Sequence, residues 1–191
     1  MTEQEIKSIV TAQRKYFQTG ATLPVEARIS ALKRLYVVIS ECEKEIHSAL
    51  KKDLGKSGFE SYMCETGLVL EEISYMLKHV RKFAGEKTVR TPLAQFHSHS
   101  YRKPSPYGVT LIMSPWNYPF MLTLSPLVDA LAAGNTAVVK PSAYSPYTSD
   151  VILQILSQCF DPEYVAVVTG GRAENTCLLK EHFDYIFFTG S

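Results

Sequence analysis

Four short polar segments carry the residues whose types suit binding or catalysis. They are residues 114–117, 140–142, 169–171 and 189–191, and each follows a short apolar run. If those runs are parallel strands, their carboxyl ends meet at one edge of a sheet, which is where such sheets bind ligands. The segments supply an amide, a lysine and several glycines, which suit a rim that binds phosphate or a nucleotide.

Asn117 is the first candidate, because Pro115 and Pro119 restrict the backbone on both sides of it. A side-chain amide held in one direction can stabilise the oxyanion that forms when a nucleophile adds to a carbonyl. Asparagine also often caps a turn, and the residues leave that interpretation open.

Lys140 is the second candidate, because it ends an otherwise apolar run. Burying an ammonium group without a partner is costly, so this position favours a role in binding a ribose or phosphate oxygen. The alternative is a surface lysine whose aliphatic part covers apolar groups. The pairs Gly170-Gly171 and Gly190-Ser191 offer small residues where a backbone can approach a ligand closely.

The second part of the sequence alternates apolar runs with helical patterns. We expect strands over residues 108–113, 136–139, 164–168 and 185–188, and helices over 121–133, 147–159 and 174–180. Strands that alternate with helices of this length predict right-handed crossovers and a parallel sheet.

The first part of the sequence predicts helices followed by a hairpin arm. Thr2 and Glu5 form a capping-box pattern before a helix that ends at Gly20, and further helices are expected over residues 24–55 and 60–83. The apolar stripe of the last helix is expected to pack within the chain, although a partner helix is the alternative. The arm is expected over residues 96–102, with His97 and His99 exposed on one face of a strand.

Composition and charge exclude several classes of function. The 191 residues carry 20 Lys and Arg against 19 Asp and Glu, a net charge of +1, which disfavours nucleic acid as a partner. The first 103 residues contain 17 basic and 12 acidic residues and the remainder contain 3 and 7, so we predict regions at 1–103 and 104–191. No apolar run approaches the length of a membrane span, and the start lacks a secretory signal, which favours the cytoplasm. The four cysteines lack metal-ligand spacing, so we expect reduced thiols and no metal site.

Taken together, the motifs resemble a known family. S-P-W-N-Y-P-F, G-N-T-A-V-V-K-P-S, V-V-T-G-G and F-F-T-G-S, in this order, resemble the amino-terminal half of the cofactor domain of the aldehyde dehydrogenase superfamily. The helical region, with L-E-E-I-S-Y-M, is similar to the class 3 branch of fatty and aromatic aldehyde dehydrogenases. The resemblance implies an α/β fold in which a helical region with a possible oligomerisation arm precedes part of a Rossmann-like, dinucleotide-binding parallel sheet.

The resemblance also implies roles for individual residues. Asn117 would donate its amide to the thiohemiacetal oxyanion, and Lys140 would reach the adenosine ribose. Gly190 and Ser191 would meet the pyrophosphate, with Phe188 beneath. The residues expected to bind NAD or NADP are Ser114, Pro115, Trp116, Lys140, Gly170, Phe188, Gly190 and Ser191.

The reaction implied by the resemblance is oxidation of an aldehyde to a carboxylate. It uses thiolate attack, hydride transfer to NAD(P) and hydrolysis by water that a glutamate activates. The family's nucleophilic cysteine and general-base glutamate lie in segments beyond Ser191, and Cys177 is expected to be structural. We therefore expect an inactive amino-terminal fragment of an enzyme that is a homo-oligomer when intact. The alternatives are a non-catalytic nucleotide-binding or association module, or part of an acylating relative that uses coenzyme A.

One position departs from the family pattern. Many relatives have glutamate after K-P-S, where this sequence has Ala143. Losing that carboxylate removes a bond to the ribose and a repulsion against a 2′-phosphate, so we expect NADP to be tolerated at least as well as in relatives with glutamate.

Overall fold

A parallel sheet forms the centre of the molecule. The computed structural model describes residues 1–190. Four strands pair in parallel in the order β5-β4-β3-β6. Their short, apolar and largely β-branched segments suit a sheet that is covered on both faces, so the predicted α/β class and parallel sheet are confirmed. The strands are β3 (Val109–Met113), β4 (Thr136–Lys140), β5 (Val165–Val167) and β6 (Tyr185–Phe188).

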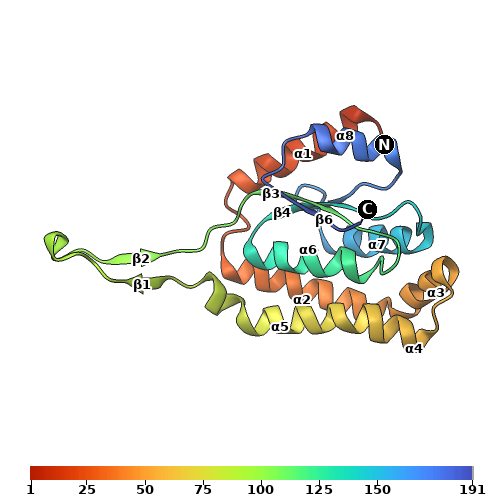
Figure 1. Cartoon of the computed structure of the whole chain (residues 1–191), viewed down its shortest axis with the longest axis horizontal. Helices are drawn as coiled ribbons and strands as arrows, with labels where there is room; N and C mark the ends of the chain where they lie inside the picture. The colour runs from red at the N-terminus through yellow and green to blue at the C-terminus, as the bar shows by residue number, and fades with distance from the viewer. Residues whose placement is uncertain (191) are drawn as a thin grey trace.

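Helices cover both faces of this sheet (Figure 1). On one face lie α1 (Glu3–Gln18) and α8 (Arg172–Lys180). On the other face lie α6 (Met121–Ala133) and α7 (Pro146–Cys159), with α2 (Val25–Glu41) and α5 (Gly67–Ala84) packed against α6. Although α1 comes from the first predicted region, it packs against β3 and β4. The division of the chain at residue 103 therefore stays a prediction.

The two faces of β3 contribute to separate parts of the core. Leu111 and Met113 pack with Ile6 and Val10 of α1, whereas Ile112 packs with the helices of the opposite face. This alternation follows from the two-residue period of a strand. The sheet is thus held from both sides by apolar side chains.

The start of the first helix agrees with its prediction, whereas the helices predicted over residues 24–55 and 60–83 are both interrupted. The capping box of Thr2 and Glu5 is confirmed. The single helix expected over residues 24–55 is wrong, because α2 ends at Glu41 and α3 (Glu43–Leu54) begins after a bend at Cys42. No glycine or proline marks that bend, and α3 packs against α7 beyond it.

The helix expected over residues 60–83 is also interrupted. A short α4 (Gly58–Ser61) leads into a π-helix (Tyr62–Thr66), and α5 continues from Gly67 to Ala84. A π-helix hydrogen bonds five residues apart, so it adds a residue to the turn and changes which side chains face inward. Val69, Ile73 and Val80 of α5 are buried within the chain, as expected.

A two-stranded arm extends away from the helices and the sheet (Figure 1). It consists of β1 (Lys87–Val89) paired antiparallel with β2 (Ser100–Arg102), so it begins earlier than the expected residues 96–102. His97 and His99 are exposed as expected, but both precede β2, and His97 has a φ of 78°. Their expected placement on one face of a strand is therefore wrong.

Three general properties bear on function. Within residues 1–190, no helix is both long and apolar enough to cross a membrane. The same residues contain no group of three His, Cys, Asp or Glu side chains placed to hold a metal ion. The four cysteines are free, with Cys159 buried and the other three half-buried.

Candidate functional site

The carboxyl ends of the strands bring the predicted polar segments to one edge of the sheet. Met113 of β3 lies opposite Lys140 on one side and Phe188 on the other. The main chain stays paired one residue further, because Ser114 N donates to Lys140 O at 3.2 Å and Thr189 N donates to Met113 O at 3.1 Å. We call this edge the carboxyl rim, and it comprises residues 114–117, 140–142, 169–171 and 188–190.

Lys140 is buried at the carboxyl rim, with 3% of its surface exposed. Its Nζ donates to the main-chain oxygens of Pro141 at 2.8 Å and Gly170 at 2.7 Å, so it ties the end of β4 to the end of β5. Burial lowers the pKa of the ammonium group, and the Glu174 carboxylate opposes that shift. The alternative of a surface lysine is wrong, and two of the three ammonium N–H groups have acceptors within the described residues.

Asn117 lies in an exposed turn between β3 and α6. No hydrogen bond from its side-chain amide is found within residues 1–190, so the structure provides no turn cap by this side chain. The backbone around it is held instead: Ser114 Oγ and Thr123 Oγ1 lie 2.5 Å apart, and Thr123 Oγ1 donates to Pro119 O at 2.5 Å. The amide is thus carried on a fixed turn and is free to donate to a ligand.

The other predicted cofactor residues line the same edge. Ser114 and Pro115 are half-buried, while Trp116 is 53% and Phe188 60% exposed. Apolar rings that stay exposed at a polar rim suit contact with a flat ligand. Their roles in binding stay predictions.

Two glycines shape the outer strand ends. Gly170 (φ 123°) and Gly190 (φ 148°) have backbone conformations that residues with a Cβ rarely adopt. Both are exposed, so their main-chain groups are accessible at the rim. Ser191, also predicted to bind cofactor, lies outside the described residues.

The sequence reasoning missed two functional candidates, Lys56 and Glu65. Their side chains form an ion pair at 2.5 Å, with 8% and 0% of each side chain exposed. Lys56 Nζ also donates to the main-chain oxygen of Asn117 at 3.0 Å. A signal was present, because Glu65 precedes the buried Val69 and Ile73 at four-residue spacing and so belongs to the apolar stripe of the helix.

Three of the four cysteines do not have the environment of a nucleophile. Burial raises the pKa of the Cys159 thiol to about 11 and also raises the pKa of Cys42. A thiol becomes nucleophilic as the thiolate, so both shifts work against attack on a carbonyl. Cys177 packs against the core beneath α1, in agreement with a structural role.

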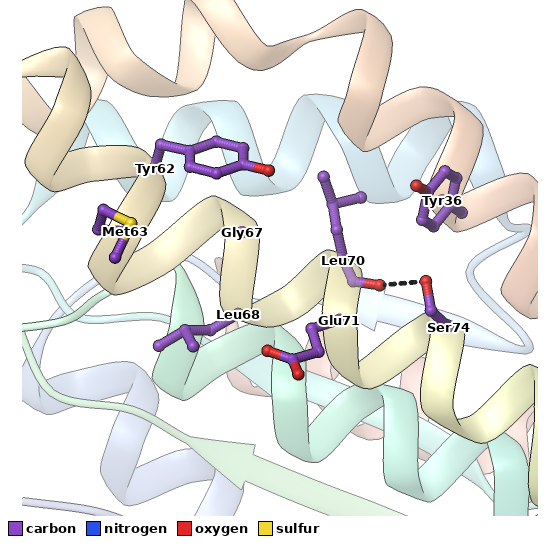
Figure 2. A pocket seen from close by; sticks show the side chains of 8 residues that line it. All are labelled: Tyr36, Tyr62, Met63, Gly67, Leu68, Leu70, Glu71 and Ser74. Carbon is purple, nitrogen blue, oxygen red and sulfur yellow. Dashed lines mark hydrogen bonds between the residues drawn. The ribbon is translucent and has the colours of Figure 1, made fainter.

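A separate groove of about 370 Å³ lies on the helical side of the molecule. Figure 2 shows it between α2, the π-helix and the start of α5, with Ser74 Oγ donating to Leu70 O at 2.8 Å. No lysine, arginine, histidine or cysteine lines it, so it lacks the groups that bind phosphate or attack a carbonyl. Its lining residues are Tyr36, Tyr62, Met63, Gly67, Leu68, Leu70, Glu71 and Ser74.

Comparison with known proteins identifies the family to which this fold and rim belong. The model of the aldehyde dehydrogenase family matches residues 1–191. The chain therefore belongs to the aldehyde dehydrogenase family, and the resemblance drawn from its motifs is confirmed.

Individual relatives agree with this assignment and with the class 3 branch. The chain is 42% identical over 178 residues to the 4,4'-diaponeurosporen-aldehyde dehydrogenase of Staphylococcus aureus, which covers 93% of this chain and 39% of that protein. It is 40% identical over 188 residues to the dimeric NADP-preferring aldehyde dehydrogenase of Canis lupus familiaris, covering 98% of this chain and 41% of that protein. It is also 40% identical over 178 residues to aldehyde dehydrogenase family 3 member A2 of Mus musculus, covering 93% and 37%.

A solved structure has the same fold over nearly the whole chain. The substrate-bound state of Staphylococcus aureus AldH superimposes with a TM-score of 0.95 and 40% identity, covering 97% of this chain and 41% of that one. This chain thus spans about 40% of the length of these relatives, corresponding to their amino-terminal part. The fragment interpretation agrees with that coverage.

Proposed function

We propose that this chain supplies the cofactor-binding rim and the oxyanion donor of an NAD- or NADP-dependent aldehyde dehydrogenase. The observation that carries this proposal is the contrast between Asn117 and its supporting turn. The side-chain amide is exposed and has no partner among the described residues, while the turn that carries it is hydrogen bonded to the rest of the chain. A fixed donor with an unused hydrogen bond suits a negative oxygen that forms during a reaction.

The residues of the rim fit a dinucleotide. Lys140 has one N–H group left for a ribose hydroxyl after its bonds to Pro141 O and Gly170 O. Gly170 and Gly190 allow the backbone to approach a pyrophosphate, and Ser191 follows Gly190 in the sequence. Ser114, Pro115, Trp116 and Phe188 are proposed to line the cleft.

When bound, NAD or NADP would supply an acceptor for the hydride that leaves the substrate carbon. Asn117 donates its amide to the carbonyl oxygen as a nucleophile adds to it and negative charge develops there. The hydrogen-bonded turn holds that amide in place, so little reorganisation accompanies the charge. Lys140 binds the ribose and thereby orients the cofactor along the rim.

An aldehyde is the proposed substrate and a homo-oligomer the proposed assembly. The arm carries Leu93, which is 91% exposed, and Phe96, which is 76% exposed, and such apolar side chains suit contact with another subunit. The dog relative, named a dimeric enzyme, supports this proposal. The same relative is named NADP-preferring, which supports use of NADP beside NAD.

The test is aldehyde-dependent formation of NADH or NADPH by the full product of the gene that encodes this chain. We expect that protein to oxidise an aliphatic or aromatic aldehyde with either cofactor, and a polypeptide limited to residues 1–191 to form no reduced cofactor. Absence of aldehyde oxidation by the full gene product, across both cofactors and both aldehyde types, would refute the proposal.

A further inference from the structure

The ion pair of Lys56 and Glu65 contacts the candidate oxyanion donor's own backbone and the residues that follow it. Lys56 Nζ donates to Asn117 O at 3.0 Å and lies 4.1 Å from the centre of the Tyr118 ring. Glu65 Oε2 accepts from Phe120 N at 2.8 Å and from Met121 N at 3.0 Å. The pair therefore connects the start of the turn to the first residues of α6.

The carboxylate of Glu65 takes the place of a local helix cap. The N-cap of α6 is Phe120, whose side chain cannot accept a hydrogen bond, so the first amides of this helix depend on a remote acceptor. An anion at a helix amino terminus is also favoured by the helix dipole. Two amides and the Lys56 ammonium together satisfy a carboxylate that is entirely buried.

Glu65 lies in the π-helix that precedes α5. Residues 62–66 form the wide turn, and Gly67 closes it, because a Cβ at Gly67 would lie 2.8 Å from Tyr62 O. Figure 2 shows the Tyr62 ring lying beside Gly67 on the groove side, while Glu65 is buried on the side of α6. Within the π-helix, Tyr62 thus faces the open groove and Glu65 contacts the turn before α6.

A purely structural role does not readily explain why these two charges are buried. Removing two charges from water carries a desolvation penalty that well-packed apolar residues avoid, so a buried ion pair is weak evidence of a role in stability. Its four contacts instead fall within residues 117–121, the segment that carries the exposed amide.

We propose that Lys56 and Glu65 are positioning residues that fix the direction of the Asn117 amide for its role in the oxyanion hole. This inference rests on the proposed function. A displacement of about 1 Å in a catalytic group can lower a rate roughly a hundredfold, so the geometry of the turn is expected to control kcat.

The main test replaces both charges together in the full gene product. A single neutralisation leaves the other charge buried and unpaired, whereas an apolar pair of similar size leaves only the Phe120 and Met121 amides without their acceptor. The double variant Lys56→Met/Glu65→Leu is therefore expected to fold and to show faster hydrogen exchange at the Phe120 and Met121 amides. Its kcat is expected to fall about 10- to 100-fold, with the KM for aldehyde within about threefold of the parent value.

A matched control is available at the opposite edge of the sheet. Arg14 Nη1 and Asp184 Oδ2 form an ion pair at 3.0 Å, and Asp184 Oδ2 accepts from Val109 N at 2.8 Å. The variant Arg14→Met/Asp184→Leu removes a less buried ion pair and an acceptor for a backbone amide, at the edge of the sheet opposite Asn117. It is expected to keep the parent kcat.

A conservative variant distinguishes a positioning role from a loss of folding. Lys56→Arg keeps the charge and a donor, so it is expected to retain more of kcat than Lys56→Met. The positioning role is overturned if the folded double variant keeps the parent kcat, or if the control pair lowers kcat as much. It is also overturned if exchange at Phe120 and Met121 does not change.

These outcomes are distinct from failure of the proposed function. If the parent protein oxidises no aldehyde, the proposed function fails and the catalytic role of the pair fails with it. Hydrogen exchange in the absence of substrate still reports whether the pair holds the turn. If the parent protein is active and only the double-variant prediction fails, the proposed function stands without this inference.

Discussion

The asparagines at the two edges of the parallel sheet have opposite environments. At the amino edge, Asn135 is 3% exposed and accepts from Gly108 N at 3.0 Å, and Asp184 accepts from Val109 N at 2.8 Å and pairs with Arg14. At the carboxyl rim, Asn117 is exposed and its amide has no partner within residues 1–190. The asparagine of the amino edge is thus buried and hydrogen bonded, whereas the asparagine of the carboxyl rim is accessible.

This difference separates residues that stabilise the fold from residues available for a ligand. A buried polar group that loses its partner costs free energy, so the amino edge is sensitive to substitution. An exposed, unpartnered amide adds little to stability, so this side chain is available for binding or catalysis. The two asparagines offer the cleanest way to test this comparison.

The largest effect is expected from Asn117→Ala in the full gene product. Loss of one oxyanion donor lowers kcat by about 100- to 1,000-fold in enzymes that depend on such donors. The melting temperature is expected to stay within about 1 °C of the parent value, because the side chain has no partner to lose. Steady-state kinetics and thermal denaturation of the same sample measure both effects. A near-normal kcat would show that Asn117 does not act in the reaction.

The reverse pattern is expected from Asn135→Ala. This change leaves Gly108 N without its acceptor and removes the bond from Asn135 Nδ2 to Ala130 O. We expect the free energy of unfolding to fall by about 1–3 kcal/mol, measured in urea, with kcat of the folded protein unchanged. If kcat of the folded protein also falls, the two edges are not functionally separate.

A smaller effect, confined to cofactor choice, is expected from Ala143→Glu. Ala143 is exposed just past the rim, so a glutamate has room there. Its carboxylate can bind the ribose hydroxyls of NAD and repels a 2′-phosphate, so the ratio of NADP to NAD affinity is expected to fall about tenfold, or about 1.4 kcal/mol. Dissociation constants for both cofactors provide the measurement, with Tyr144→Phe as a neighbouring control. An unchanged ratio would show that this position does not face the ribose.

The smallest effect is expected in the helical layer, away from both edges. Partial desolvation by its neighbours, and then the nearby Glu72 carboxylate, raise the pKa of Asp129 to about 6, and because the side chain stays exposed the effect on stability is small. The folded state therefore holds this proton more tightly than the unfolded chain does, and stability from this group falls as pH rises from about 4 to about 6. Asp129→Asn is expected to raise the melting temperature by about 1–2 °C at pH 8 and to have little effect at pH 4. A gain that is largest at pH 4 would contradict this sign.

The strands and the resemblance could be predicted because they depend on local patterns. Each strand of the sheet is an apolar run with a polar or glycine-containing segment after it, and the Thr2–Glu5 capping box is a spacing of three. The bend at Cys42 could not be predicted, because no glycine or proline marks it and the cause is packing of α3 against α7.

The environment of the site residues depended on contacts distant in sequence. Lys140 donates to Gly170 O, thirty residues away in the sequence, and Glu65 accepts from Phe120 N, fifty-five residues away. Residue type and spacing therefore located Asn117 and Lys140, but they left open whether each was buried or exposed. The support of the turn by Lys56 and Glu65 became visible only with the packing of the π-helix against α6.

The most direct test of the carboxyl rim as the cofactor site is hydrogen exchange of the full gene product with and without NADP. We expect protection to rise at residues 114–117, 140–143, 169–171 and 188–190, and to stay unchanged at Gly108, Asn135 and Asp184 on the amino edge. Protection at the amino edge alone, or an unchanged rim in a protein that oxidises aldehydes, would contradict the account.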